Sequence, residues 1–127
     1  MLNGESLELL SIKINDTKAN YELKDDGLLL IEPLDSFILE TTVRIHPESK
    51  TNLNGLYQSS GNFCTQCEAH GFRQITYYLD RPDILSVFTT KIKANRDYYP
   101  ILLSNGNLVE ESSSHAIWHD PAPKPCY

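Results

Sequence analysis

The chain has 127 residues, a length that suits one domain able to bury a core without disulfides or metal. Seventeen acidic against eleven basic residues give a formal net charge of −6, and no Lys/Arg-rich run is present, which argues against a nucleic acid partner. No apolar run reaches the ~18 residues that a membrane span requires, and the N-terminus lacks a secretory pattern. Three cysteines, an odd and small number, fit a reducing compartment, so a soluble cytoplasmic protein is predicted.

The first third of the chain alternates apolar and polar residues as strands do. Over residues 7–14 the apolar phase shifts once, which predicts a strand with a bulge near Leu9-Leu10, followed by a turn at Asn15-Asp16. A second turn is predicted at Asp26-Gly27. Residues 37–45 give the clearest strand, with odd-numbered side chains on one face and even-numbered side chains on the other.

The last third also predicts strands. Residues 84–92 are rich in β-branched and aromatic residues, and residues 98–103 lead into the Asn-Gly pair of 104–107, which favours a tight hairpin. The tail 120–125 carries three prolines and is expected to run extended along the surface rather than continue a central strand. The sequence therefore predicts an all-β, mainly antiparallel domain of about eight to ten short strands.

Two cysteines and a histidine have the types and spacing of zinc ligands: Cys64-x-x-Cys67-x-x-His70, with Cys126 or His119 completing four. On a strand, residues three apart face opposite sides, so only a turn could bring both thiolates onto one metal. Free thiols are the favoured interpretation. A thioredoxin-like pair would need a helix that starts at its first cysteine, and no helix is predicted there.

Three further motifs favour structural roles. His115 and His119 have the spacing of the zinc protease motif but lack its Glu, so we interpret them as surface histidines on a short strand, not sharing a face. The segment 80–83 predicts a turn closed by bonds between its carboxylates and Arg81. The tyrosine pairs 77–78 and 98–99 are interpreted as packing at the edge of the core, with a ligand platform as the alternative.

Gln66 and Glu68 are a candidate pair for ligand binding. Two apart on an extended chain, they would project from one face and offer an amide and a carboxylate to a single small cationic group. The alternative is two solvated polar residues on an outer strand face, and the residues alone leave both interpretations open.

The segment "GLYQSSGNFCTQCEAHGFRQITYYLDRPDILSVFTTKI", residues 55–92, together with "YPILLSNGNLVE" and "HDPAPKPCY", resembles the N-terminal β-domain of bacterial aminopeptidase N, of the gluzincin zinc metallopeptidase family. Residues 1–54 are compatible with that domain but carry a weaker signature. The resemblance implies a saddle-like, mainly antiparallel β-domain over residues 1–127, as a partial N-terminal domain of a larger enzyme.

The resemblance also implies a function. The parent enzyme would remove N-terminal amino acids from peptides by zinc-activated water, with Zn²⁺ held in a separate catalytic domain. Gln66 and Glu68 match the family's Gln-x-Glu segment, which reaches into the catalytic cleft and holds the substrate's α-amine. An α-amine has a pKa of about 7.7–8.0 and is largely cationic at neutral pH, so a carboxylate there would select peptides with a free N-terminus.

The chain contains no His-Glu-x-x-His, no downstream Glu ligand and no Gly-Ala/Met-Glu-Asn segment, so we expect a fragment that is inactive alone and contributes no catalytic residue. Residues 111–116 depart from the family's Gly-Arg-His-Trp strand. Two alternatives remain: a free-standing β-module that binds peptide or saccharide through the paired tyrosines, and a small domain stabilised by zinc on Cys64, Cys67, His70 and Cys126.

Overall fold

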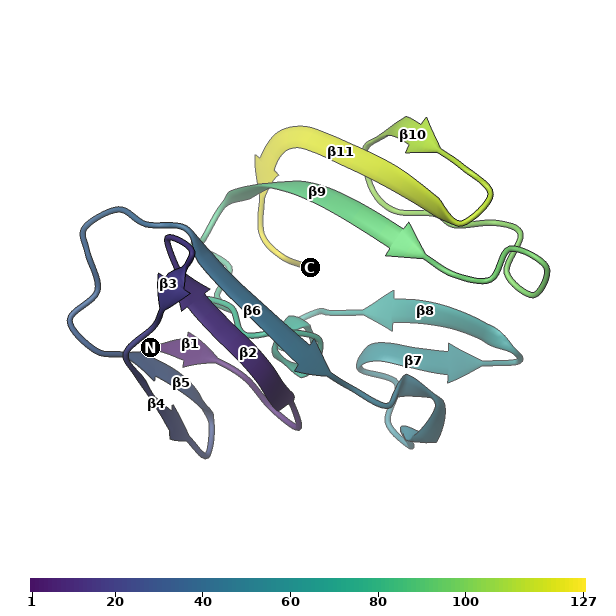
Figure 1. Ribbon diagram of the computed structural model, residues 1–127. Helices are drawn as coiled ribbons and strands as arrows, with labels where there is room; N and C mark the ends of the chain where they lie inside the picture. Colours follow the sequence, from purple (N-terminus) through teal and green to yellow (C-terminus); the bar gives the residue numbers. More distant parts are fainter. The chain divides into compact units, whose positions relative to one another are not determined.

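Antiparallel strands make up almost all of the regular structure in the computed structural model, which describes residues 1–127 (Figure 1). The strands are β1 (Leu2–Asn3), β2 (Glu8–Ile14), β3 (Thr17–Lys18), β4 (Tyr21–Lys24), β5 (Gly27–Leu30), β6 (Leu39–Arg44), β7 (Gly55–Ser59), β8 (Asn62–Gln66), β9 (Ser86–Lys93), β10 (Asn107–Glu111) and β11 (His115–Lys124). Two 3₁₀ helices, η1 (Pro47–Ser49) and η2 (Phe72–Gln74), complete the set, so the all-β antiparallel prediction is confirmed. Neither helix has the length or apolarity that crossing a membrane requires.

The chain divides into two compact units, one formed by Met1–Arg81 with Cys126–Tyr127 and the other by Pro82–Pro125. The first unit holds the sheets β1-β5-β4 and β3-β2-β6 and the hairpin β7-β8. The second unit holds the sheet β10-β11-β9. All of these sheets are small, and four of the seven strand pairings join consecutive strands.

The sheet β3-β2-β6 follows the predicted pattern. Side chains of β6 alternate between half-buried and exposed from one residue to the next, as expected for a strand with one face on the core. The pairing of β2 with β6 shifts register between Leu9 and Ser11, which confirms the predicted bulge. Ile12 of β2 packs with Ala19 and Leu28 in the core of this unit.

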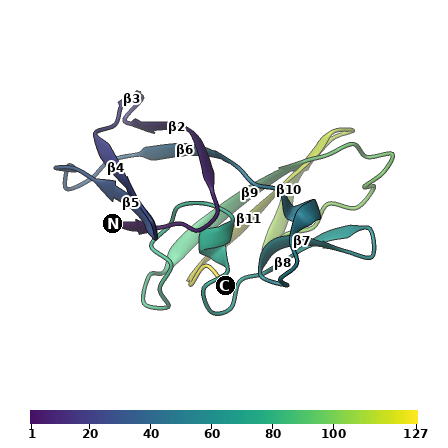
Figure 2. The same ribbon diagram turned by 90° about the horizontal axis from the view of Figure 1, so that it is seen from below.

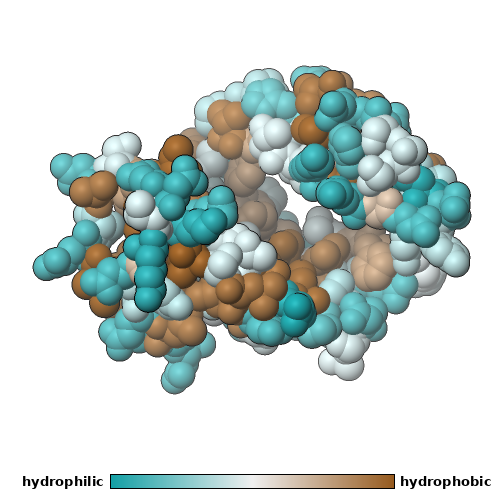
Figure 3. Space-filling model, in the orientation of Figure 1, coloured by the Kyte–Doolittle hydropathy of each residue, from teal (hydrophilic) through white to brown (hydrophobic).

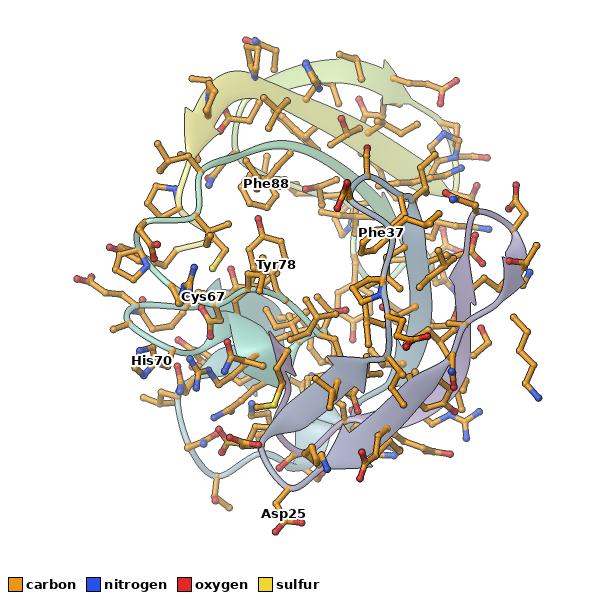
Figure 4. All side chains as sticks on the ribbon, turned by 90° about the vertical axis from the view of Figure 1, so that its left-hand side faces the viewer. Asp25, Phe37, Cys67, His70, Tyr78 and Phe88 are labelled. Atoms are coloured by element: carbon orange, nitrogen blue, oxygen red, sulfur yellow. The ribbon has the colours of Figure 1, made fainter.

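The turns of the first unit match the sequence closely. Asn15 and Asp16 both have positive φ, 50° and 62°, in the turn between β2 and β3, as predicted. The turn before β5 lies one residue earlier than predicted, at Asp25-Asp26, and Figure 4 shows Asp25 at the tip of that hairpin. Gly27 instead begins β5, where a Cβ would collide with the carbonyl oxygen of Leu2.

The hairpin β7-β8 carries Gln66 at its base, and Glu68 lies in the turn that follows. Its register runs from Ser59 opposite Asn62 to Gly55 opposite Gln66, so Gln66 is the last residue of β8. The short helix η1 lies against β7 (Figure 2). The position of Gln66 is thus fixed by the strand pairing, whereas the residues after it belong to a turn.

Residues 98–103 do not form a strand, so the predicted hairpin around Asn105-Gly106 is wrong. β10 follows that pair, but it pairs with β11 rather than with residues 98–103. Backbone carbonyls of the irregular segment are bonded by side chains instead: Trp118 Nε1 donates to the Leu102 carbonyl at 3.0 Å, and Arg96 Nη2 donates to the Pro100 carbonyl at 2.6 Å. These side-chain donors satisfy groups that a second ladder would have used.

The proline-rich tail belongs to β11, which was not predicted, but residues 121–123 are extended and exposed, as predicted. Pairing with β10 ends at His119 opposite Asn107, and beyond that point β11 pairs with β9 alone. The register with β9 shifts between Asp120 and Lys124, so the intervening prolines occupy an irregular stretch. Proline is tolerated there because a bulge with one free side does not need every backbone N–H.

Candidate functional site

Gln66 and Glu68 flank the point at which β8 ends. Cys67 follows the strand, and residues 68–70 form a turn that is closed by a hydrogen bond from the Gly71 N–H to the Cys67 carbonyl, 2.8 Å from donor to acceptor. The peptide bond between Glu68 and Ala69 is cis. Glu68 lies in the turn and not on an extended chain, so the predicted shared face of Gln66 and Glu68 is wrong.

Both candidate side chains are exposed to solvent, and neither forms a hydrogen bond or an ion pair. A carboxylate in this state has its acceptor positions open to an incoming ligand. The Glu68 side chain is therefore available for binding, and the backbone beneath it is held by the turn.

Two glycines allow the chain to pack tightly around the base of the turn. Gly55, opposite Gln66, has φ +72°, and a Cβ there would lie 3.0 Å from Gln74 Cβ and 3.1 Å from the Gly71 carbonyl oxygen. A Cβ on Gly71 would overlap the Asn54 side chain and the Gln66 carbonyl oxygen. The hairpin β7-β8 and the start of η2 thus meet at backbone distance.

A buried carboxylate lies behind the turn. Asp80 is 1% exposed, and its Oδ2 accepts hydrogen bonds from Arg73 Nε at 2.8 Å and from the Arg73 backbone N–H at 3.2 Å. Its Oδ1 accepts from Cys126 Sγ at 3.1 Å. Burial pushes the pKa of Asp80 up, but the hydrogen bonds from Arg73 and Cys126 outweigh burial, so its pKa lies below the ordinary value. The partner of Asp80 in this ion pair is Arg73, not the predicted Arg81.

A second network of hydrogen-bonded side chains lies beside the turn. Lys50 Nζ donates to Gln74 Oε1 at 2.6 Å, and Gln74 Nε2 donates to Glu5 Oε1 at 3.4 Å. Burial lowers the pKa of Lys50, although nearby Glu5 and Cys67 act in the opposite direction. These three residues line a cavity of about 360 Å³ that includes neither Gln66 nor Glu68.

The thiols and histidines do not come together as metal ligands: no group of three or more His, Cys, Asp or Glu side chains is arranged to hold an ion. Cys64 is exposed on β8, and His70 is exposed in the loop between β8 and η2, where Figure 4 also places Cys67. Burial and the neighbouring Asp80 raise the pKa of Cys67, and the same causes raise that of Cys126 to about 12. The zinc-stabilised alternative has no ligand set in this structure, because the four side chains it needs are not brought together.

His115 and His119 lie on a regular stretch of β11, so they share a face, contrary to the prediction. Four residues of strand put their backbones about 13 Å apart. His115 is bonded to Glu110 and Ser112, whereas His119 is bonded to Thr89. Each histidine therefore has its own local partners, and the two do not form one site.

The tyrosine pairs have different surroundings. The Tyr78 ring packs edge-on against the Phe72 ring with centroids 5.0 Å apart, and its backbone forms a bridge with Asn3. Tyr77 is half-buried beneath Gly4. Tyr98 is 78% exposed while Tyr99 is half-buried. The first pair matches the predicted packing at the core edge, and nothing in these contacts favours a ligand platform.

The family model described as the peptidase M1 N-terminal domain matches residues 2–127 of this chain. The chain belongs to the peptidase M1 N-terminal domain family. Among relatives of this family, aminopeptidase N of Escherichia coli K12 is 52% identical over 99% of this chain and 15% of its own length. Aminopeptidase N of Caulobacter vibrioides is 47% identical over 100% of this chain and 16% of its own length. The resemblance carried by residues 55–92, 99–110 and 119–127 is therefore confirmed.

A solved structure shares the fold. The crystal structure of Legionella pneumophila aminopeptidase A in complex with aspartic acid aligns with a TM-score of 0.92 and 37% identity, over 99% of this chain and 16% of that chain. The predicted fold type, that of the N-terminal domain of these aminopeptidases, is therefore confirmed. The chain spans about 15–16% of the length of the relatives it matches.

Proposed function

We propose that residues 1–127 act as the N-terminal domain of a zinc-dependent aminopeptidase, in which Gln66 and Glu68 bind the α-amine of a peptide substrate. The observation that supports this best is the exposed, unpartnered carboxylate of Glu68 on a braced turn. Membership of the peptidase M1 N-terminal domain family, whose relatives named above are aminopeptidases, supports the reaction class.

The chemistry of this binding is a charge pair. A free α-amine has a pKa of about 7.7–8.0 and so is mostly an ammonium group at neutral pH, with three N–H donors. Glu68 would accept a charge-assisted hydrogen bond of about 2.7–2.9 Å from the ammonium group, and the Gln66 amide oxygen would accept a second bond from the same cation. A blocked or internal peptide has no such cation, so this pair would select chain ends and orient the first residue.

The rest of the reaction lies outside this chain. Its residues offer no ligand set for zinc, so we assign the metal and the bond-breaking chemistry to a separate catalytic domain of a longer protein. We expect the 127-residue chain to hydrolyse no peptide by itself. Its three cysteines are free thiols, which supports a reducing, cytoplasmic location as part of the same proposal.

Exposed apolar side chains support a large protein partner. Figure 3 shows apolar surface, in brown, among hydrophilic side chains. Within residues 98–103, Tyr98, Ile101 and Leu103 are 78%, 73% and 70% exposed. Apolar residues clustered in this way are typical of surfaces that are covered in an assembly. A catalytic domain in the same polypeptide is the partner that fits the greater length of the relatives.

Kinetics of the longer protein with Glu68→Ala and Glu68→Gln test the proposal. Removal of the charge partner is expected to cost about 2–5 kcal/mol of transition-state stabilisation for a peptide with a free N-terminus. This corresponds to a fall in kcat/KM of about thirtyfold or more. Asp25→Ala is the matched control, because Asp25 is also an exposed acid in a tight turn. Unchanged kinetics in both Glu68 variants would show that this carboxylate does not hold the amine.

A further inference from the structure

Asp80 joins three segments that are far apart in the sequence. Besides its bonds to Arg73 and Cys126, its backbone N–H donates to Asn3 Oδ1 at 3.3 Å. Its carbonyl oxygen accepts from Arg73 Nη2 at 3.1 Å, so Arg73 grips both the side chain and the backbone of Asp80. The residue is therefore a buried junction between β1, η2 and the segment at Cys126.

The hydrogen bonds between Asp80 and Arg73 fix η2, the helix that follows the Glu68 turn. Arg73 is the second residue of η2, and the Asp80 carboxylate bonds its backbone N–H as well as its guanidinium group. η2 begins one residue after Gly71, whose N–H closes the turn onto Cys67 and whose carbonyl accepts from Gln74 N at 3.0 Å. The turn is held on one side by the pairing of β8 and on the other by η2.

We propose that Asp80 is a positioning residue for the Glu68 carboxylate. Its hydrogen bonds with Arg73 fix η2, and η2 fixes, through Gly71, the turn that presents Glu68 to the substrate amine. The inference rests on the proposed amine-binding role. Asp80 itself touches no substrate, since it is buried.

An ionised carboxylate suits this junction better than an amide does. Asp80 has donors on both oxygens, Arg73 on one and Cys126 on the other. The Asn side chain has one oxygen and one NH₂ group, so Asp80→Asn keeps the shape but turns a donor toward either Arg73 or Cys126. With the NH₂ group toward Arg73, two donors oppose each other; with it toward Cys126, Arg73 keeps an oxygen acceptor that no longer carries charge. In both orientations the bonds that hold η2 are weakened.

The test is steady-state kinetics of the full-length protein that carries this chain, with Asp80→Asn compared with Asp120→Asn. Asp120 is the matched control because it is also buried, at 6% exposed, and is paired with Lys124 in the other compact unit. A displaced Glu68 weakens substrate binding, so Asp80→Asn is expected to raise KM about tenfold with kcat within about twofold of wild type. A lower kcat with unchanged KM in Asp80→Asn would overturn the inference, because it indicates only loss of active enzyme.

Hydrogen exchange measured by mass spectrometry on the same proteins follows the turn without reference to catalysis. Faster exchange in peptides covering residues 66–72 is expected for Asp80→Asn and not for Asp120→Asn. When η2 is held less firmly, the hydrogen bond from the Gly71 N–H to the Cys67 carbonyl opens more often. Unchanged exchange there would also overturn the inference. Arg73→Lys keeps the cation but cannot bond the Asp80 carboxylate and carbonyl at the same time. It should change KM and hydrogen exchange in the same direction as Asp80→Asn, by a smaller amount.

The two proposals fail in different ways. If Glu68→Gln has normal kinetics, the amine-binding proposal is wrong, and Asp80 is then not a positioning residue for substrate even if exchange in the turn rises. If Glu68→Gln raises KM while Asp80→Asn leaves both KM and exchange unchanged, amine binding stands and the inference about Asp80 is wrong.

Discussion

Replacement of Gly71 by Ala tests how tightly the Glu68 turn is packed. Gly71 has φ −79° and ψ −25°, which any L-residue adopts, so the backbone conformation itself costs nothing. The added Cβ would overlap the Asn54 side chain and the Gln66 carbonyl oxygen and lie 2.8 Å from Cys67 Cα. Two of these three neighbours are backbone atoms of β8 and the turn, which cannot move without disturbing the strand pairing.

The cost of Gly71→Ala follows from that geometry. Overpacking a tight site costs about 1–3 kcal/mol, and the alanine recovers about 0.4–1 kcal/mol by restricting the unfolded chain. Because backbone atoms block the site, the overpacking cost should lie in the upper half of its range. We therefore expect the free energy of unfolding to fall by about 2 kcal/mol, and KM of the longer protein to rise because Glu68 moves with the turn.

Chemical unfolding of the 127-residue chain, followed by circular dichroism, measures the first effect. Gly61→Ala is a suitable comparison, because its Cβ would meet no atom within 4 Å whereas its φ is +84°. That variant should lose about 1 kcal/mol from backbone strain alone and leave KM unchanged. A Gly71→Ala chain as stable as wild type would refute the reasoning, since the turn would then have room that the structure denies it.

Two further predictions concern titratable groups. The pKa of Asp80 is below its ordinary value in the folded chain. Asp80 therefore contributes stability that is fully present above its unfolded pKa of about 3.9 and is lost as the pH falls through the lower folded pKa. The drop in Tm from pH 6 to pH 3 should be smaller for Asp80→Asn than for wild type, and an equal drop would contradict this. Exposed Cys64 should be alkylated by iodoacetamide before half-buried Cys67, and Cys126 should be alkylated last because its pKa is raised to about 12. Mass spectrometry reports the order of modification. Early modification of Cys126 would show that Asp80 does not form a hydrogen bond with its thiol.

The local features of the first unit were predictable from the sequence. The alternation along β6 and the phase shift in β2 reflect which side chains meet the core, and that pattern is written in adjacent residues. Turns at Asn15-Asp16 and near Gly27 depend on residues that tolerate positive φ or close approach, which is again local chemistry.

Contacts between distant residues account for the errors. Residues 98–103 have strand-like composition, but the indole of Trp118 and the guanidinium of Arg96 bind their carbonyls from outside the segment. The carboxylate of Asp80 is bonded by Arg73, seven residues earlier, and by Cys126, 46 residues later. No periodicity in the sequence predicts such pairs, because they depend on where the turn and η2 place the chain.

The candidate site was only partly accessible to pattern reasoning. Gln66 and Glu68 were identified as polar residues two apart, and the resemblance to aminopeptidases gave them a role. The turn after Cys67 changes the geometry from a shared strand face to a strand end followed by a loop. The roles of Asp80 and Gly71 beside this turn were not predicted: the sequence pattern assigned Asp80 a structural role but paired it with Arg81 instead of Arg73, and it carried no signal for Gly71.

A crystal structure of the longer protein with a bound free amino acid tests the central claim most directly. The account predicts that the α-amine nitrogen lies about 2.7–2.9 Å from a carboxylate oxygen of Glu68, with the Gln66 amide also within hydrogen-bonding distance. If the amine is held by other residues while Glu68 remains in solvent beyond hydrogen-bonding distance, the proposed role of this turn is contradicted.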